Sequence, residues 1–478
     1  MTRTIRGWWR KRQGLALAII LGWATGAQAS SDALLQKLVE KGVLTQEEAN
    51  QVREELDKED AQTVELYNKT KVAAWIDEMK WYGDVRLRAE YFDNEDQSNE
   101  IDRWRYRLRL RLGLDMKFQD WAKLGVRLAS GGDDPVSTNQ SFQDTFTRKT
   151  IGIDLAYVTL TPPFADWISV TGGKMNNPVW QPSFNSPMQY DFDVTPEGLG
   201  EQVSFKLGDK QQHRLFANFG QFVLDEIGGD SNDPWMIEIQ GGGEARFGED
   251  PKNPKVKVTA VGGFSQTFNL QNMGVASGSQ PGGATAPSGA QSTSPNRGNA
   301  TRQPGGPAAP GNTLFYLDDF QTVYGMAEVA LKVCDRPFLH TPALVTVSGE
   351  YIANLTDKYD SLSGSNITVD QDQTEGWTVQ VGFGSAKKKG EWQVAYQYKY
   401  LEADATWDAV TDSDWGLGGT DRDGHVGKFA YNIREWWQVG LTGFWTKKIS
   451  SRPNSGENTR GNDGRHLIRV QGDMVFKF

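Results

Sequence analysis

Five arginines at alternate positions are the residues best suited to act on other molecules. They are separated by apolar residues and run as follows: Arg103, Arg105, Arg107, Arg109 and Arg111. A guanidinium stays charged at any physiological pH, so a row of them creates a fixed positive field that attracts anions. Arg86 and Arg88, a short way upstream, have the same alternate spacing. The chemistry that these residues predict is electrostatic selection of charged solutes.

Side chains that could act in catalysis or bind a metal are scattered along the sequence. The four histidines stand in separate segments without metal-ligand spacing, and no nucleophile elbow, phosphate loop or paired-cysteine site is present. Aspartates cluster between residues 404 and 423, but their spacing does not match a calcium-binding loop, so we predict a solvated acidic loop there. We expect no catalytic residue, no metal site and no cofactor.

The spacing of the arginines predicts the element that carries them. A helix would scatter them around its circumference, whereas a β-strand places all five on one face and the apolar residues on the other. That apolar face needs a hydrophobic partner about 25 Å tall, which the lipid around a transmembrane β-barrel supplies. Arg86 and Arg88 share the inward phase on the preceding strand, so the positive face is two strands wide.

The same alternation continues from Trp81 to the end of the chain and predicts about sixteen antiparallel strands. We place them at 82–92, 102–117, 121–131, 150–161, 165–176, 198–208, 211–222, 235–247, 255–269, 320–333, 343–355, 375–386, 391–402, 424–433, 436–449 and 465–478. Connections after even-numbered strands are mostly short, and those after odd-numbered strands are mostly long. Short periplasmic turns and long external loops are typical of bacterial barrels. The sequence therefore predicts an all-β transmembrane barrel over residues 81–478.

Residues 1–29 have the features of a secretory signal peptide. Five basic residues precede an apolar run that is shorter than the roughly 20 residues of a spanning helix, and Ala27-Gln28-Ala29 is a cleavage pattern. Cleavage would remove five of the 51 basic residues and leave 46 against 61 acidic ones, a net charge of −15. Nucleic acid is excluded as a partner, because a domain that binds phosphates carries a basic surplus.

Two further segments differ from the barrel pattern. Residues 30–80 have helical spacing, with Thr45 and Glu48 forming a capping box, and predict a short α-helical periplasmic segment. It is either a solvated spacer or an arm that oligomerises or contacts the cell wall. Residues 270–319 are rich in Gly, Pro, Ala, Ser and Asn without apolar periodicity, and predict a long mobile external loop.

The sequence resembles the outer-membrane porin superfamily, specifically the "putative porin" families of Gram-negative bacteria. The resemblance rests on the signal peptide, the helical stretch with Lys41-Gly42-Val43-Leu44-Thr45, the arginine strand, the segment 172–178 and the terminal Phe478. It implies a sixteen-stranded barrel in outer-membrane lipid, often a homotrimer. It also implies that Phe478 belongs to the signal recognised by the barrel-assembly machinery.

The resemblance further implies that the third external loop, residues 177–197, folds into the lumen. Its acids, Asp191, Asp193 and Glu197, would then face the arginines and set up a transverse field that selects solutes. The alternative is that the arginines pair with wall carboxylates such as Asp84 and Glu90 and only stiffen the wall.

These features lead us to expect an outer-membrane porin that passes small hydrophilic solutes and ions by passive diffusion. The arginine face should raise the permeability of anions relative to cations. Two alternatives remain: a structural or conduit barrel that sheaths or anchors another protein, and an outer-membrane barrel enzyme. The enzyme would need a catalytic cluster near one rim, where only His425 and His466 are candidates.

Overall fold

The computed structural model divides into two units, residues 1–72 and 73–478. It describes residues 76–94, 102–132, 134–226, 231–270, 319–334, 337–356, 373–449 and 466–478, and shorter pieces at 39, 41, 45, 51–52, 274–276, 293–295, 299, 301–302 and 314–316. The predicted signal peptide and nearly all of the predicted helical segment lie outside these residues. Within the described part, no helix is long and apolar enough to cross a membrane.

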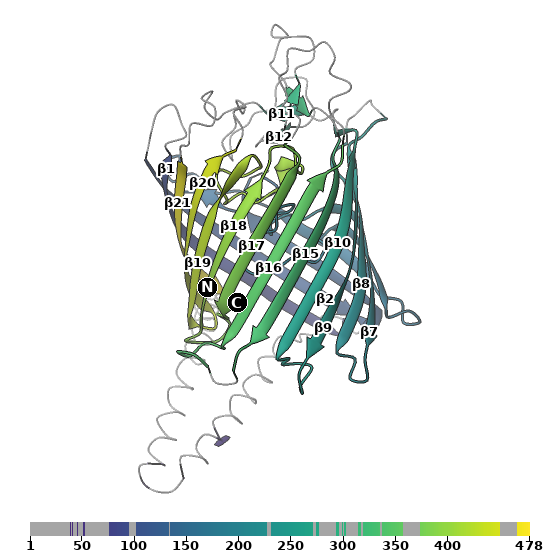
Figure 1. Cartoon of the computed structure of the whole chain (residues 1–478), viewed down its shortest axis with the longest axis vertical. Helices are drawn as coiled ribbons and strands as arrows, with labels where there is room; N and C mark the ends of the chain where they lie inside the picture. The colour runs from purple at the N-terminus through teal and green to yellow at the C-terminus, as the bar shows by residue number, and fades with distance from the viewer. Residues whose placement is uncertain are drawn as a thin grey trace, which may run out of the picture. The chain divides into compact units, whose positions relative to one another are not determined.

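Residues 73–478 form a closed antiparallel β-barrel of sixteen long strands, tilted and side by side (Figure 1). The strands are β1(Glu78–Asn94), β2(Arg103–Phe118), β3(Ala122–Ser130), β5(Ile151–Leu160), β6(Ile168–Lys174), β7(Glu197–Leu207), β8(His213–Val223), β9(Trp235–Phe247), β10(Val256–Phe268), β15(Gln321–Lys332), β16(Leu344–Asn354), β17(Glu375–Gly384), β18(Trp392–Leu401), β19(Arg422–Arg434), β20(Trp437–Lys448) and β21(His466–Lys477). The two-residue β4(Gln140–Ser141) also pairs with β2. The predicted barrel and all sixteen predicted strands are confirmed.

The first strand begins earlier than the sequence suggested. Glu78 pairs with Lys117 and Lys80 with Asp115, so β1 and β2 stay in register beyond the predicted start at Trp81. Charged residues at alternate positions gave this end of the strand no apolar signal, and the helical pattern upstream concealed it. The predicted boundary at residue 80 is therefore wrong by three residues.

Alternation along β2 separates the lipid face from the lumen. Trp104 and Tyr106 are 64% and 53% exposed on the outside, whereas Arg107 and Arg109 are buried on the inside. The expected assignment of faces is therefore observed for this strand. All seven arginines named from the sequence belong to the inner face of β1 and β2, which are paired from Glu78 to Phe92.

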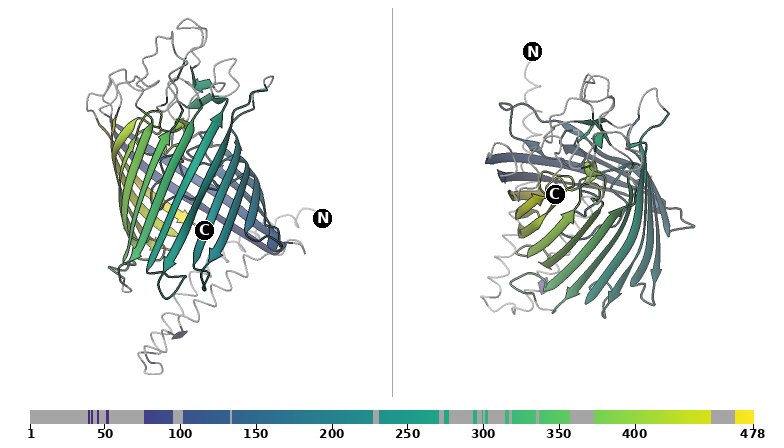
Figure 2. Two further views of the ribbon diagram at one scale, coloured as in Figure 1. Left: turned by 45° about the vertical axis from the view of Figure 1, so that its right-hand side comes forward. Right: turned by 45° about the horizontal axis from the view of Figure 1, so that its top comes forward.

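The barrel closes where its first and last strands meet, side by side at the purple and yellow ends of the colour scale (Figure 2). The backbone N–H of Gly83 donates to the Phe478 carbonyl at 2.9 Å, and the Phe478 N–H donates to the Gly83 carbonyl at 3.1 Å. The Phe478 ring lies over Gly83, where a Cβ atom would come within 2.6 Å of it. Phe478 thus extends the seam beyond the last paired residues of β21.

Two connections at the long-loop end fold into the lumen. We call them inner loop A, residues 175–196 between β6 and β7, and inner loop B, residues 402–421 between β18 and β19. Met188 of loop A and Trp415 of loop B pack against inward side chains such as Tyr324 and Ile352. The hydrophobic core therefore lies inside the barrel, and its wall residues come from strands between β8 and β20.

Inner loop B contradicts the prediction of a solvated acidic loop. Asp404, Asp408 and Asp421 have no exposed surface. Asp408 accepts hydrogen bonds from the Asn299 N–H at 3.0 Å and from the Tyr316 hydroxyl at 2.9 Å. The aspartates are buried because loop B turns inward and is covered by part of the long connection 270–319.

The connection 270–319 also differs from the featureless loop that its composition suggested. Its described residues form a small separate sheet: β11(Gly274–Ala276), β12(Thr293–Pro295), β13(Thr301–Arg302) and β14(Leu314–Tyr316). Asn299 and Tyr316 are both buried. The contacts that order them come from loop B, 100 residues away, so no local pattern could indicate them.

Candidate pore constriction

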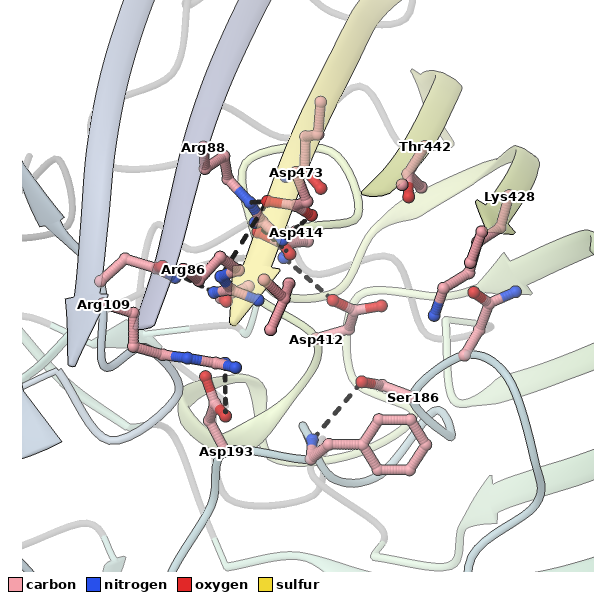
Figure 3. Close-up of a pocket in the computed structure, with 18 of the residues that line it drawn as sticks. Arg86, Arg88, Arg109, Ser186, Asp193, Asp412, Asp414, Lys428, Thr442 and Asp473 are labelled. Carbon is pink, nitrogen blue, oxygen red and sulfur yellow. Dashed lines mark hydrogen bonds and ion pairs between the residues drawn. The ribbon is translucent and has the colours of Figure 1, made fainter. Parts of the chain in front are cut away.

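A cavity of about 410 Å³ lies inside the barrel between the inner loops and the wall (Figure 3). The wall side consists of β19, β20, β21, β1 and β2, and contributes Arg86, Arg88 and Lys428 among others. The opposite side consists of loop A with Asp193 and loop B with Asp414. The inner loops fill the opposite side of the lumen, and this cavity lies between them and the charged wall.

Wall carboxylates neutralise part of the arginine row. Asp84 on β1 binds Arg109 at 2.8 Å and Arg111 at 2.6 Å. Glu90 binds Arg105 and Arg469 at 2.6 Å each. Each acid lies beside its arginines because β1 is paired in register with β2 on one side and β21 on the other, with the same residue phase facing inward. Wall pairing, one of the two arrangements considered from the sequence, is thus present.

Loop B supplies a carboxylate that the sequence analysis placed in a solvated acidic loop. Asp414 binds Arg88 at 2.7 Å and Arg469 at 2.8 Å, and so fastens loop B to β1 and β21. Burial alone would raise the pKa of Asp414, but the guanidiniums of Arg88 and Arg469 hold it well below its ordinary value. Asp473 of β21 binds the other edge of Arg88 at 2.7 Å.

Only one of the three acids predicted for loop A faces the arginines. Asp193 lies 3.4 Å from Arg111 and 3.8 Å from Arg109. Asp191 instead accepts the backbone N–H groups of Asp193 and of Ser413 in loop B, both at 2.8 Å. Burial, with Asp193 and Asp412 nearby, raises the pKa of Asp191 well above its ordinary value. Its carboxyl group therefore joins the two loops and does not contact the row.

Glu197 is not at the constriction. It is the first residue of β7 and forms an ion pair with Lys174 at 2.9 Å, with 64% of its side chain exposed. Glu197 and Lys174 also pair in register, next to the outward residues Leu199 and Gly172. Glu197 was predicted to be the last residue of the inward loop, but it begins β7, and its position in that strand directs it to the outer face.

The row of arginines divides into two groups. Arg86, Arg88, Arg109 and Arg111 line the cavity. Arg103 and Arg105 lie nearer the long-loop end, where their guanidiniums stack on Phe92 at 4.8 and 5.0 Å. Arg107 donates to the Ser137 hydroxyl and the Asn139 carbonyl. The predicted pore-lining set is therefore brought together along one wall, but its first three members on β2 do not border the cavity.

Residues that the sequence analysis missed include Lys428 on β19 and Asp412 in loop B. Lys428 alternates with the outward Gly427 and Phe429, and this phase could have placed it in the lumen. Asp412 could not be placed, because a loop has no periodicity that says which way it turns. Its partner, Lys399 of β18, lies 3.5 Å away.

Loop A is held on the far wall by glutamates without a paired arginine. Glu328 accepts the backbone N–H of Ser183 at 2.7 Å, and Glu350 accepts the N–H of Met188 at 2.9 Å. Glu238 accepts the Tyr190 hydroxyl at 2.7 Å. These bonds, from β9, β15 and β16, extend loop A across the lumen from its origin at β6.

A closed barrel with inward loops and a charged opening defines a channel-forming β-barrel of the porin type. The chain belongs to the "putative porin" family, whose model matches residues 94–457. No curated protein matches it.

Several solved outer-membrane proteins are similar to this chain at low identity. OprB of Pseudomonas putida is 10% identical, with 88% of this chain and 97% of that chain covered and a TM-score of 0.48. The outer membrane channel DcaP of Acinetobacter baumannii is 15% identical, with 86% and 99% covered and a TM-score of 0.43. OmpT of Vibrio cholerae, in a trimer form, is 12% identical, with 84% and 99% covered and a TM-score of 0.43.

Proposed function

We propose that this protein is an outer-membrane porin through which small hydrophilic solutes and ions diffuse passively. The observation that carries the proposal is the cavity of about 410 Å³ left between the inner loops and the charged wall. Small inward residues, including Ala430, Gly440 and Thr442, border it on the wall side. A Cβ atom added to Gly440 would approach other atoms no closer than 3.5 Å, an ordinary van der Waals distance, so a small side chain fits at this position.

The alternatives gain less support. An enzyme would need His425 or His466 near acids and a nucleophile. The His425 ring instead stacks on Trp445 at 5.2 Å and the His466 ring is tilted against it at 4.6 Å, and Trp445 is exposed on the outer face. A conduit barrel would need a lumen filled by its cargo or by its own loops. The loops fill the side of β8 to β18 and leave the arginine side open.

We also propose that a second copy of the chain covers the outer face of β6 to β8, as part of a homotrimer. Glu201 on β7 lies on the outer face between Val170 and Phe219, with Gln221 3.3 Å away. It is four residues from Phe205, whose ring stacks on Trp167 near the short-turn end. A carboxylate at this height is unfavourable in lipid. Wild-type protein should migrate as an oligomer in unheated gels, and Glu201→Arg should weaken that oligomer more than Glu201→Gln; a monomeric wild type would overturn the assembly.

Chemical modification of a cysteine introduced into the cavity lining tests whether the protein forms a channel. The chain has one cysteine, Cys334, which is exposed and can be replaced by serine. In that background Gly440→Cys should conduct in planar bilayers, and a charged methanethiosulfonate reagent should reduce its conductance. Val379→Cys, on the lipid face, is the matched control and should be unaffected. A wild-type protein that folds but carries no current would contradict the proposal.

A further inference from the structure

The acids that line the cavity are already occupied by donors. Asp473 accepts both Nε and Nη2 of Arg88, and Asp414 accepts Arg88 and Arg469. Asp412 accepts the backbone N–H of Asp414 at 2.9 Å and Lys399 at 3.5 Å. Asp191 and Asp193 are engaged with backbone N–H groups and arginines, as described above. A cation entering the cavity would therefore have to displace existing partners.

Several donors around the same cavity remain available. Lys428 uses one N–H, to the Phe184 carbonyl at 2.6 Å, and makes no ion pair within the described part of the chain. The Nε of Arg86 is buried without a hydrogen bond and lies 4.0 Å from the nearest oxygen of Asp473, while its Nη2 donates to Asn139. The amide nitrogen of Asn185 is likewise buried without an acceptor.

We propose that Arg86, Asn185 and Lys428 form a subsite that binds the carboxylate or phosphate group of a small anionic solute. All three line one cavity, and Figure 3 shows Arg86 and Lys428 directed toward its centre from opposite sides. An anion offers acceptor oxygens to both cations and to the amide, whereas a cation or a neutral apolar solute satisfies none of them. The inference rests on the proposed function, because the solute reaches the subsite through the channel.

The ion pairs within the cavity determine whether it prefers anions or cations, even though its formal charges nearly balance. Three arginines of the cavity form close ion pairs. Arg88 pairs with Asp414 and Asp473, Arg109 with Asp84, and Arg111 with Asp193. Within the described residues Lys428 makes no ion pair, and Arg86 makes only the 4.0 Å contact to Asp473. Arg86 on β1 and Lys428 on β19 are therefore cations of this cavity without a close carboxylate, and Lys477 of β21 adds a further positive charge to the lining.

Block of chloride current in the full-length wild-type protein tests the subsite. Malonate and inorganic phosphate are added as probes, and uncharged malonamide serves as the control of the same size. Each anion should lower the chloride conductance in a saturable way, and malonamide should not. In Lys428→Gln the half-blocking concentration should rise about tenfold, as expected for the loss of one charge-assisted hydrogen bond. Arg86→Gln should also raise the half-blocking concentration, whereas Lys428→Arg, which keeps the positive charge, should be blocked as the wild type is.

Lys80→Gln provides the matched control, because it removes one positive charge from the inner face of β1 outside this cavity. It should leave the half-blocking concentrations unchanged. Block by only one of the two probes supports the subsite and identifies carboxylate or phosphate as its ligand. Wild-type current that neither anion reduces overturns the subsite while leaving the porin intact, and this holds even if the variants do not fold. Absence of any wild-type current instead overturns the proposed function.

Discussion

The two sides of the lumen hold the inner loops by different chemistry. On the side of β9 to β16, Glu328 and Glu350 accept backbone N–H groups of loop A, and apolar side chains fill the space between them. On the side of β21, β1 and β2, ion pairs join Asp414 of loop B to Arg88 and Arg469. The first side is packed, and the second retains a cavity of about 410 Å³. The barrel wall alone therefore does not determine where a pore lies, because the position of the cavity depends on which side of the lumen the loops cover.

The largest effect should come from the seam on the open side. Deleting Phe478 removes two backbone hydrogen bonds to Gly83 and the ring that covers it. An open edge in lipid costs several kcal/mol for each unsatisfied backbone group, and the resemblance to porins adds loss of the assembly signal. We expect the deletion to abolish most folded barrel, measured as the heat-shifted band in gels of outer membranes. Phe478→Tyr, which keeps the ring, should assemble; normal levels of the deletion variant would contradict this role.

A smaller effect is expected on the packed side. Glu328→Ala with Glu350→Ala leaves the N–H groups of Ser183 and Met188 without their acceptors. The Met188 donor is buried, so the loss of its acceptor costs about 1–3 kcal/mol, whereas the Ser183 bond is part-buried and its loss costs less. Loop A should therefore leave the wall while the strands stay paired. Single-channel conductance should increase and become noisier. The Gln variants keep an acceptor oxygen and should conduct nearly as wild type, whereas unchanged conductance in the Ala pair would show that apolar packing alone holds the loop.

Loop B offers the corresponding test on the open side. Asp414→Asn removes the charge that binds Arg88 and Arg469, and Asp414 is 26% exposed in its side chain. Its loss should cost between the ~1 kcal/mol of an exposed pair and the ~3–5 kcal/mol of a buried one. The freed guanidiniums should shift the reversal potential in a salt gradient toward anions. The low pKa of Asp414 means that its own charge should persist as pH falls through the ordinary titration range of aspartate, so the wild type and Asp414→Asn should keep different reversal potentials there. Loss of that difference within this range would contradict the ion pairs.

The difference between the two sides also shows what the sequence could reveal. Alternation predicted the strands and placed Arg86 and Arg109 on the inner face, because a strand's geometry has a period of two. It could not predict that Asp414 would reach Arg88, because loop B has no period and its contacts depend on how it crosses the lumen. The resemblance to porins predicted an inward loop A and hence Asp193 beside Arg111. It did not extend to loop B, so the carboxylates that the fold buries there were expected in solvent.

The smallest effect should come from the arginines beyond the cavity. Arg105 binds Glu90 at 2.6 Å, but Glu90 also accepts Arg469 at 2.6 Å and Gln471 at 3.1 Å, so it keeps two partners when Arg105 is replaced by Gln. Arg105 lies outside the cavity and its charge is compensated, so its removal should shift the reversal potential less than Lys428→Gln, which removes an uncompensated charge from the cavity lining. Both folded variants are compared in one salt gradient. An equal or larger shift for Arg105→Gln would mean that the whole arginine row sets the field, and that the distinction between compensated and uncompensated cations does not determine selectivity.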